Sequence, residues 1–521
     1  MIFTRTAAFT KLKNTTCWDV VVIGGGASGL GIAVDAASRG YNTLLLEKYD
    51  FAKGTSSKST KLVHGGVRYL AQGDIKLVKS ALKERGIIFQ NAPHVSSLQS
   101  FVIPVYSFWA KLKFLIGLKV YDGLAGHLRI GKSTLLNKAQ VIEAIPQIKQ
   151  EGLQGGIRYF DGQFDDARLA LNLAQTAVEQ GAVVLNYAAL SCIHKDQNGQ
   201  VNGLTFQDSV AHETYRVNCK ALINATGVFV DDVLKLDQPA HQPLVRPSQG
   251  IHLVVDAKFL GDRHALMIPE TSDGRVLFGV PWHGKVLLGT TDTPLDKHQI
   301  EPHAQEEEIQ FILSTAKDYL QVAPKRKDVR SVFAGLRPLA APSKGDGKSS
   351  KEISREHKLL KSASGIITIT GGKWTTYRRM AEECLDFTIG AGLLEQRRCK
   401  TKQLRIHGYT THKQSGHTQI YGSDAQGIAE LIDQNAALAA KLHPDYDFTH
   451  AELIWSCRQE MLVKVEDFLA RRIRLLFLDA RVSLSIAPLV AKIMAQELGK
   501  DEAWIQQELA DYELLVKNYS L

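Results

Sequence analysis

A glycine-rich turn close to the N-terminus constrains the fold of this chain more than any other feature. An apolar, β-branched run (20–23) leads into three glycines with the spacing G-x-G-x-x-G, and a small-residue stretch with helical periodicity (28–39) follows. The three glycines are Gly24, Gly26 and Gly29. Such a turn lets the backbone approach a pyrophosphate at the positive N-terminus of a helix. The sequence therefore predicts a Rossmann-like β-α-β unit that binds a dinucleotide.

The residues after this turn support the same interpretation. A second apolar run (43–46) ends at Glu47, a position from which a carboxylate can hold ribose hydroxyls. Two further strand-like runs end in glycine much later, at Gly227 and at the pair Gly371 and Gly372. Three glycine-terminated strand ends spread along the chain suit a long, extended cofactor. We therefore expect FAD rather than NAD.

The length of 521 residues exceeds what one hydrophobic core usually supports, so we expect several structural units. Residues 251–292 alternate between strand and turn patterns, which predicts an antiparallel sheet. Beyond residue 401 the pattern becomes helical, so we place a domain boundary near residue 395. The periodic stretches of this last part lie near 425–441, 450–478, 482–498 and 501–517.

The net charge of +9 is concentrated near the N-terminus, where residues 1–130 hold 17 Lys and Arg against 7 Asp and Glu. A localised positive field suits an anionic ligand or membrane surface, and no element that reads nucleic acid accompanies it. The six cysteines show no metal-like spacing, so we expect no metal site and a reducing compartment. No apolar run approaches the roughly 20 residues that a membrane-spanning helix needs.

A polar stretch, TSSKSTKLVHGGVRYL (55–70), concentrates hydroxyls, cations, a histidine and glycines. With this stretch and several others, the sequence resembles the FAD-dependent glycerol-3-phosphate dehydrogenase family over nearly its whole length. The other resembling segments are the N-terminal glycine motif, FDDARLALNLAQ (164–175), INATG (223–227), GIHLVV (250–255), LLGTTDTP (287–294), AGLRPL (334–339), ISREH (353–357), GGKWTTYR (371–378) and the helical C-terminus.

This resemblance implies a fold of the D-amino-acid-oxidase type. The class is α/β, or α+β overall, with a Rossmann-like FAD-binding domain, an inserted antiparallel-sheet substrate domain and a C-terminal all-helical cap domain. The implied boundaries are 1–395 for the FAD-dependent oxidoreductase region, with FAD-binding parts at about 17–95, 160–245 and 345–395 and substrate-domain parts at about 96–159 and 246–344, and 396–521 for the helical domain.

The resemblance also implies an activity. Members of the family oxidise sn-glycerol 3-phosphate to dihydroxyacetone phosphate by hydride transfer to non-covalently bound FAD, and they pass the electrons to a membrane quinone. Many are peripheral membrane proteins. We therefore expect a cytoplasmic protein at the inner face of the cell membrane, with a homodimer left open. We expect neither nucleic acid nor metal as a partner.

The chemistry of this reaction and the resemblance together nominate site residues. The base is expected to be His252, with His64 second, because imidazole titrates near neutral pH. Arg337 and Lys373 are expected to serve in catalysis as well as in phosphate binding, since the charged fork of arginine suits phosphate oxygens. The expected substrate-binding residues are Arg68, Tyr69, Arg337, Arg355 and Lys373. The expected cofactor-binding residues are Gly24, Gly26, Ser28, Gly29, Glu47, Thr55, Ser59, Gly65, Gly66, Ala225, Gly227, Gly371, Gly372 and Thr375.

Three segments outside this set allow two interpretations each. The segment 107–127 interleaves aromatic and apolar residues with lysines, which suits an anionic membrane surface or a packed surface helix. A quinone acceptor favours the membrane. For Arg471, Arg472 and Arg474 we expect a solvated helix face rather than a partner site. The T-T-D turn at 290–292 is expected to be a structural cap outside the site.

Two alternative functions stay open. An oxidase of the same fold would pass electrons to oxygen and produce peroxide, and a regulator that has lost turnover would only bind the flavin. The chain has no calcium-binding loop and none of the extra C-terminal cysteines of subunit-dependent anaerobic members, which favours a bacterial-type enzyme. Residues 1–17 faintly resemble a transit peptide, but we expect a frayed terminus.

Overall fold

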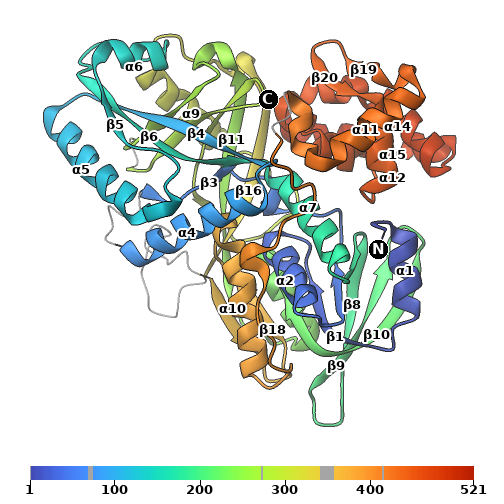
Figure 1. The fold of residues 1–521 in the computed structure, drawn as a ribbon. Coiled ribbons are helices and arrows are strands. Elements are labelled where there is room, and N and C mark those ends of the chain that lie inside the picture. The colour runs from blue at the N-terminus through green and yellow to red at the C-terminus, as the bar shows by residue number, and fades with distance from the viewer. Residues whose placement is uncertain (1, 68–73, 272–273, 341–356, 413–415) are drawn as a thin grey trace.

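Two large sheets and a helical region build the molecule (Figure 1). The computed structural model describes residues 2–67, 74–271, 274–340, 357–412 and 416–521. Strands of the two sheets alternate along the chain, so the second sheet is inserted into the first. The predicted class, a Rossmann-like domain with an inserted antiparallel-sheet domain and a helical C-terminus, is confirmed.

The first sheet has the strand order β17-β18-β10-β1-β2-β7, and β9 joins β10 to β8. Its strands are β1 (Cys17–Ile23), β2 (Thr43–Leu46), β7 (Val183–Leu185), β8 (Ala188–Lys195), β9 (Val201–Asp208), β10 (Glu213–Asn224), β17 (Lys358–Lys361) and β18 (Ile367–Thr370). β18, β10, β1, β2 and β7 run parallel, and the inner strands are apolar because helices cover them. The carboxyl ends of β18, β10 and β1 therefore share one edge.

Helices cover this sheet, and α2 (Ala27–Ser38) packs between α7 (Asp166–Glu179) and α10 (Tyr377–Gly390). The predicted β-α-β unit is thus β1, α2 and β2. The expectation of a frayed N-terminus is wrong for α1 (Arg5–Lys13), which packs against β7. The helix is held in place because the Arg5 guanidinium pairs at 2.5 Å with Asp208, a residue distant in sequence. The short helix α8 (Val230–Asp237) follows β10.

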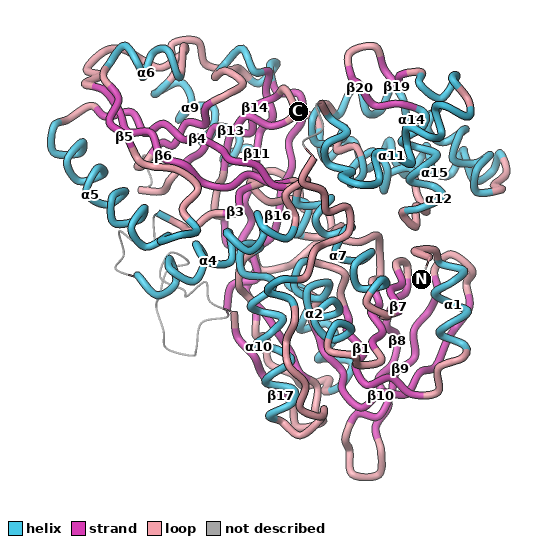
Figure 2. The backbone as a smooth tube through the Cα atoms, viewed as in Figure 1, coloured by secondary structure: helices cyan, strands magenta, loops and turns pink. Residues whose placement is uncertain are grey.

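The second sheet has the order β15-β11-β14-β13-β12-β4-β6-β3, with β16 on β11 and β5 on β6. Figure 2 draws the strands of both sheets in magenta. Its strands are β3 (Leu62–Val63), β4 (Ser96–Val105), β5 (Thr134–Leu136), β6 (Gly155–Phe164), β11 (Val245–Asp256), β12 (His264–Ile268), β13 (Leu277–Trp282), β14 (Lys285–Gly289), β15 (Thr293–Pro294) and β16 (Val329–Ala340). All pairs are antiparallel except β4 with β12. The antiparallel sheet predicted for 251–292 is present as β11 to β14.

Both faces of the second sheet are covered, as the alternating side chains of β11 show. Ile251, Leu253 and Val255 pack towards α6 (Lys138–Ala144) and α9 (Glu306–Tyr319). His252 and Val254 point to the opposite face, because successive side chains of a strand alternate. Val254 there joins a core made with the C-terminal helices. The helices α4 (Ile75–Asn91) and α5 (Phe108–Ala125) lie at the edge of this region.

The C-terminal region consists of helices and one hairpin. Its elements are α11 (Ala425–Gln434), β19 (Lys441–His443), β20 (Tyr446–Thr449), α12 (His450–Gln459), α13 (Leu475–Leu478), α14 (Ala480–Leu498) and α15 (Glu502–Val516). The stretch predicted as one helical unit over 450–478 is broken: a π-helix spans Asp467–Arg472, and Arg474 has a left-handed φ of 65°. The described residues contain no helix with the length and apolarity to cross a membrane.

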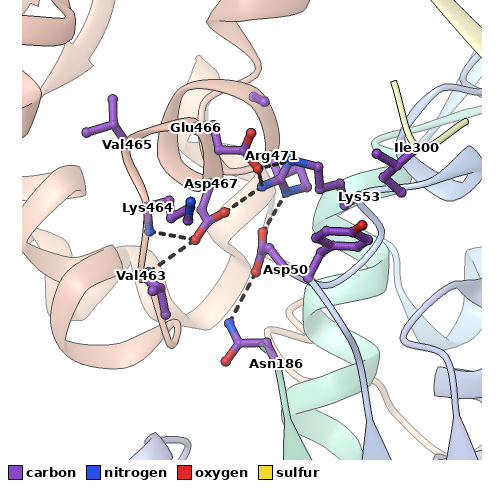
Figure 3. A network of polar contacts seen from close by, with 12 residues as sticks. Asp50, Lys53, Asn186, Ile300, Val463, Lys464, Val465, Glu466, Asp467 and Arg471 are labelled. Carbon is purple, nitrogen blue, oxygen red and sulfur yellow. Dashed lines mark hydrogen bonds and ion pairs between the residues drawn. The ribbon is translucent and has the colours of Figure 1, made fainter. Parts of the chain in front are cut away.

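The expectation that Arg471, Arg472 and Arg474 form a solvated face is wrong, because all three are buried. The Arg471 Nε donates to Asp50 at 2.6 Å, and its Nη2 to Asp467 at 2.5 Å (Figure 3). Arg472 also donates to Asp50, at 2.8 Å. These charges are therefore stable inside the protein only because carboxylates from distant elements pair with them.

Candidate active site

A cavity of about 700 Å³ opens between the two sheets. From the first sheet it is lined by the residues that follow the carboxyl ends of β1, β10 and β18, and from the second by residues of β11 and β16. In parallel α/β sheets this edge is where ligands bind. The nominated residues that line it are Gly24, Gly26, Ser28, Glu47, Thr55, Ser59, His64, Gly66, Ala225, Gly227, His252, Arg337, Gly371, Gly372, Lys373 and Thr375.

The glycine turn leaves no room for side chains. Gly24 has a left-handed φ of 110°, and a Cβ on it would lie 2.7 Å from the Ala225 carbonyl oxygen. A Cβ on Gly29 would lie 1.8 Å from the Gly24 carbonyl oxygen, so only glycine allows α2 to start here. Gly26 itself has no side chain to cap the helix, and the Ser56 hydroxyl accepts from the Ala27 N–H at 2.9 Å. The glycines of the turn still present backbone without side chains at a positive helix end, which fits the pyrophosphate of FAD.

Glu47 reinforces this turn at the end of β2. Its Oε2 accepts from the Gly25 N–H at 2.6 Å, and its Oε1 accepts from the Tyr49 N–H at 2.9 Å. Burial raises the pKa of Glu47, while these two backbone hydrogen bonds oppose that rise. Each carboxylate oxygen keeps a further acceptor site, so the residue can still receive a ribose hydroxyl.

The hydroxyls of two nominated cofactor residues are used within the protein. Thr55 donates to the Leu336 carbonyl oxygen at 2.6 Å, and Ser59 donates to Asp166 Oδ2 at 2.6 Å. Both residues line the cavity, so a cofactor would contact their other atoms rather than these hydroxyl protons. Gly65 does not line it: a Cβ there would lie 2.5 Å from Leu82 Cδ2, so this glycine serves packing.

His252 lies where the two sheets meet. A Cβ on Gly289, its partner on β14, would lie 2.6 Å from the imidazole Cδ2, so glycine makes room for the ring. Phe333 of β16 stacks on the ring with centroids 4.9 Å apart. Nε2 lies 2.9 Å from the Thr60 hydroxyl, while buried Nδ1 has no partner among the described residues. Burial, and then the charges of Lys61 and Arg337, hold the pKa of His252 well below its usual range.

Arg337 points into the cavity from β16, held by the T-T-D turn. Its Nη2 donates to the Thr290 hydroxyl at 3.1 Å and to the Thr291 carbonyl oxygen at 2.9 Å, and its Nη1 lies 3.2 Å from Asp292 Oδ1. The expectation that this turn lies outside the site does not account for its contacts with Arg337. All three turn residues line the cavity. The turn is also structural, because Thr291 donates to Glu308 at 2.7 Å.

Lys373, in the loop that follows β18, and His64, which follows β3, both line the cavity. Gly371 and Gly372, with φ of 79° and 81°, turn the chain so that Lys373 lines the cavity. The His64 N–H donates to the Thr375 hydroxyl at 3.2 Å. The predicted residues Arg68, Tyr69 and Arg355 lie outside the described residues. In the ranges that the structure does describe, no group of His, Cys, Asp or Glu could hold a metal ion.

Comparisons with known proteins agree with this architecture. A family described as FAD dependent oxidoreductase matches residues 19–378, and one described as C-terminal domain of alpha-glycerophosphate oxidase matches residues 365–505. The mitochondrial glycerol-3-phosphate dehydrogenase of Saccharomyces cerevisiae is 36% identical, over 98% of this chain and 91% of the yeast protein.

Two solved structures extend the comparison. The glycerol-3-phosphate dehydrogenase of Bacillus halodurans, complexed with FAD, has a TM-score of 0.80 at 30% identity and covers 99% of this chain and 97% of that one. The L-alpha-glycerophosphate oxidase of Mycoplasma pneumoniae shares the fold, with a TM-score of 0.58 at 15% identity over 74% of this chain and 97% of that one. With its glycine turn, its two-sheet cavity and these relatives along its full length, the chain belongs to the FAD-dependent glycerol-3-phosphate dehydrogenase family.

Proposed function

We propose that this enzyme oxidises sn-glycerol 3-phosphate to dihydroxyacetone phosphate and passes the electrons to a membrane quinone. The observation that carries the proposal is the convergence of His252, Arg337 and Lys373 on the cavity that the glycine turn enters. Bound FAD supplies the acceptor for the hydride of the carbinol carbon. The remaining proton of the alcohol must leave as the carbonyl forms, so a base is needed beside the same carbon.

His252 suits that base because its lowered pKa keeps the imidazole neutral, and therefore able to accept a proton, at neutral pH. Arg337 and Lys373 supply the positive charge that a phosphate dianion requires. Arg337 has a guanidinium fixed by the T-T-D turn, so it is already oriented before substrate arrives. Arg68, Tyr69 and Arg355 remain predicted contributors to phosphate binding.

Anaerobic addition of glycerol 3-phosphate tests this function. The purified protein should lose its flavin absorption at ~450 nm as the hydride reaches the cofactor. Glycerol without the phosphate, as a control, should leave the band unchanged at the same concentration. A yellow protein that keeps the band with glycerol 3-phosphate would favour the turnover-deficient regulator instead.

The surface of α5 supports a membrane acceptor. Large apolar side chains recur along its exposed side, and a soluble monomer rarely gathers so many on one helix. They are Phe108, Trp109, Leu112, Ile116 and Val120, with exposed fractions of 65%, 76%, 41%, 56% and 46%. Lys111 and Lys113 flank them, as in helices that lie on anionic lipid. We assign this face to the cytoplasmic surface of the cell membrane, where a quinone would be reduced.

Flotation with liposomes tests the membrane surface. Wild-type protein should float with vesicles that contain anionic phosphatidylglycerol, and Trp109→Ser with Ile116→Ser should remove most of the floating fraction. Leu514→Ser is the matched control, because Leu514 is 65% exposed on α15, outside this face. If all three proteins stay with the soluble fraction, α5 is not a membrane surface.

The oxidase alternative is kept because the C-terminal region matches a domain described for alpha-glycerophosphate oxidase. The two functions differ only in how the reduced flavin is reoxidised. Stopped-flow mixing of reduced enzyme with oxygen or with a soluble quinone separates them. We expect fast reoxidation by quinone and slow reoxidation by oxygen; the reverse order would identify an oxidase.

A further inference from the structure

The loop 57–61 has one side in the cavity and the other in the protein interior. Ser59 and Thr60 line the cavity. Lys61 points the opposite way and is completely buried. Its Nζ donates to the Ser57 carbonyl oxygen at 2.6 Å and to Asp166 Oδ2 at 2.7 Å. Hydrogen bonds on the interior side of the loop therefore hold it, and the groups that make them do not line the cavity.

Asp166, the first residue of α7, joins this loop to the C-terminal region. Its Oδ2 accepts from the Ser59 N–H at 3.1 Å as well as from the Ser59 hydroxyl and Lys61. Its Oδ1 accepts from Arg474 Nη2 at 2.9 Å. With no exposed side-chain surface, the carboxylate has exchanged water for these donors. Lys61, Asp166 and Arg474 are called the buried cluster below.

Arg474 enters this cluster from the break between the π-helix and α13. Its left-handed backbone turns the side chain towards the loop, where Nη2 donates to the Ser57 carbonyl oxygen at 2.8 Å. Nη1 donates to the Ala470 carbonyl oxygen at 2.9 Å, which ties the guanidinium to its own segment. Two cations thus share one loop carbonyl, and one of them belongs to the C-terminal region.

The buried cluster reaches His252 by two routes. The Thr60 hydroxyl, one residue before Lys61, lies 2.9 Å from Nε2. The Phe333 ring that stacks on the imidazole also lies 5.2 Å from Lys61 Nζ. If the Nε2–H donates to Thr60, the lone pair is on Nδ1, the ring nitrogen without a partner among the described residues. Because Nδ1 is buried, this contact also decides whether the nitrogen beside the cavity residue Thr60 carries the lone pair or the proton.

We infer that the buried cluster holds loop 57–61 so that Thr60, through its contact with Nε2, fixes the orientation and the tautomer of the His252 imidazole. The C-terminal region then completes the active site through Arg474, although Arg474 touches neither substrate nor cofactor. Arg474, Asp166 and Thr60 are positioning residues. The inference rests on the proposed function, because it concerns the base of that reaction. Displacements near 1 Å at a reacting group can cost about 100-fold in rate.

A double-mutant cycle tests the route from Arg474 through Thr60. Arg474→Lys keeps the charge but loses the forked contact with Ser57 and Asp166, and Thr60→Val removes the hydroxyl at similar size. Each should slow the reduction of bound flavin by glycerol 3-phosphate about tenfold. Combined, they should slow it about 20-fold rather than about 100-fold, because both act through one contact. Thr60→Ser should restore most of the rate.

Arg168→Lys is the matched control. Arg168 lies on α7 close to Asp166, is equally buried, and pairs across to the C-terminal residue Glu460 at 2.5 Å. Among the described residues, no hydrogen bond or ion pair joins its side chain to loop 57–61, so its replacement should weaken the domain contact without changing the rate per bound flavin. An Arg474→Lys rate equal to that of Arg168→Lys, or additive effects in the cycle, would overturn the inference.

Nitrogen NMR of holoenzyme labelled with ¹⁵N-histidine tests the tautomer without turnover. The His252 signals are identified by their loss in His252→Gln. We expect a single tautomer in wild type and in Arg168→Lys, and both tautomers to be populated in Thr60→Val and Arg474→Lys. Two tautomers in wild type, or a single unchanged tautomer in Thr60→Val, would overturn the inference. This result does not depend on the substrate, so failure of the proposed function would be seen separately as an unreduced wild-type flavin.

Discussion

The two walls of the cavity are built in different ways. The wall from the first sheet is mainly backbone, where Gly24 and Gly29 exclude side chains and α2 presents its N-terminus. The wall from the second sheet is made of side chains, such as His252 and Arg337, that neighbouring strands and turns hold in place. A backbone wall suits a cofactor that stays bound, and a charged wall suits a substrate that comes and goes. Changes to the two walls should therefore separate cofactor retention from substrate turnover.

The largest effect is expected on the backbone wall. Gly29→Ala places a Cβ 1.8 Å from the Gly24 carbonyl oxygen, so the turn must open. Overpacking of about 3 kcal/mol corresponds to about 100-fold weaker FAD binding. The ratio of FAD to protein after dialysis measures this loss. Gly390→Ala is the control, because a Cβ there meets nothing within 4 Å. Full FAD content in Gly29→Ala would break the comparison.

A smaller effect, confined to turnover, is expected on the side-chain wall. Arg337→Lys keeps a cation beside Asp292 but loses the fork held by the T-T-D turn, so kcat/KM for glycerol 3-phosphate should fall about 30-fold, or about 2 kcal/mol. FAD content should stay unchanged. Arg330→Ala, on the same strand but half exposed, should change kcat/KM less than about twofold. Loss of FAD with unchanged kcat/KM in Arg337→Lys would reverse the assignment of the walls.

The smallest effect concerns pH. Burial, together with Lys61 and Arg337, lowers the pKa of His252 well below its ordinary value, so the neutral imidazole dominates from pH 6.5 upwards. The rate of flavin reduction at saturating substrate should therefore vary less than about twofold between pH 6.5 and about 8.5, and should fall only as pH drops through the lowered pKa. Stopped-flow absorbance measures this profile. A tenfold rise centred on an ordinary histidine pKa would show that His252 is not held this way.

The two walls also differ in how far the sequence predicts them. The glycine turn is local: its spacing, the apolar run before it and the helical stretch after it lie within one short segment. The sequence pattern therefore predicts β1, α2 and β2 directly. The antiparallel sheet and the C-terminal helices follow in the same way, from strand alternation and helical periodicity.

The side-chain wall depends on contacts between distant residues. Asp292 and Arg337 meet because β15 and β16 both pair with β11, a register that spacing along the chain does not reveal. Arg474 was expected on a solvated face because periodicity cannot show that Asp166, on α7, lies opposite it. The resemblance predicts His252, but its low pKa depends first on burial and then on the charges of Lys61 and Arg337, which come from other elements.

In the proposed reaction, His252 accepts the hydroxyl proton of glycerol 3-phosphate while the bound flavin takes the hydride. Single-turnover reduction of wild type and His252→Gln, followed at ~450 nm without oxygen, tests it most directly. We expect the variant to bind substrate with a similar Kd and to bleach at least about 100-fold more slowly. A variant that bleaches at the wild-type rate would contradict it.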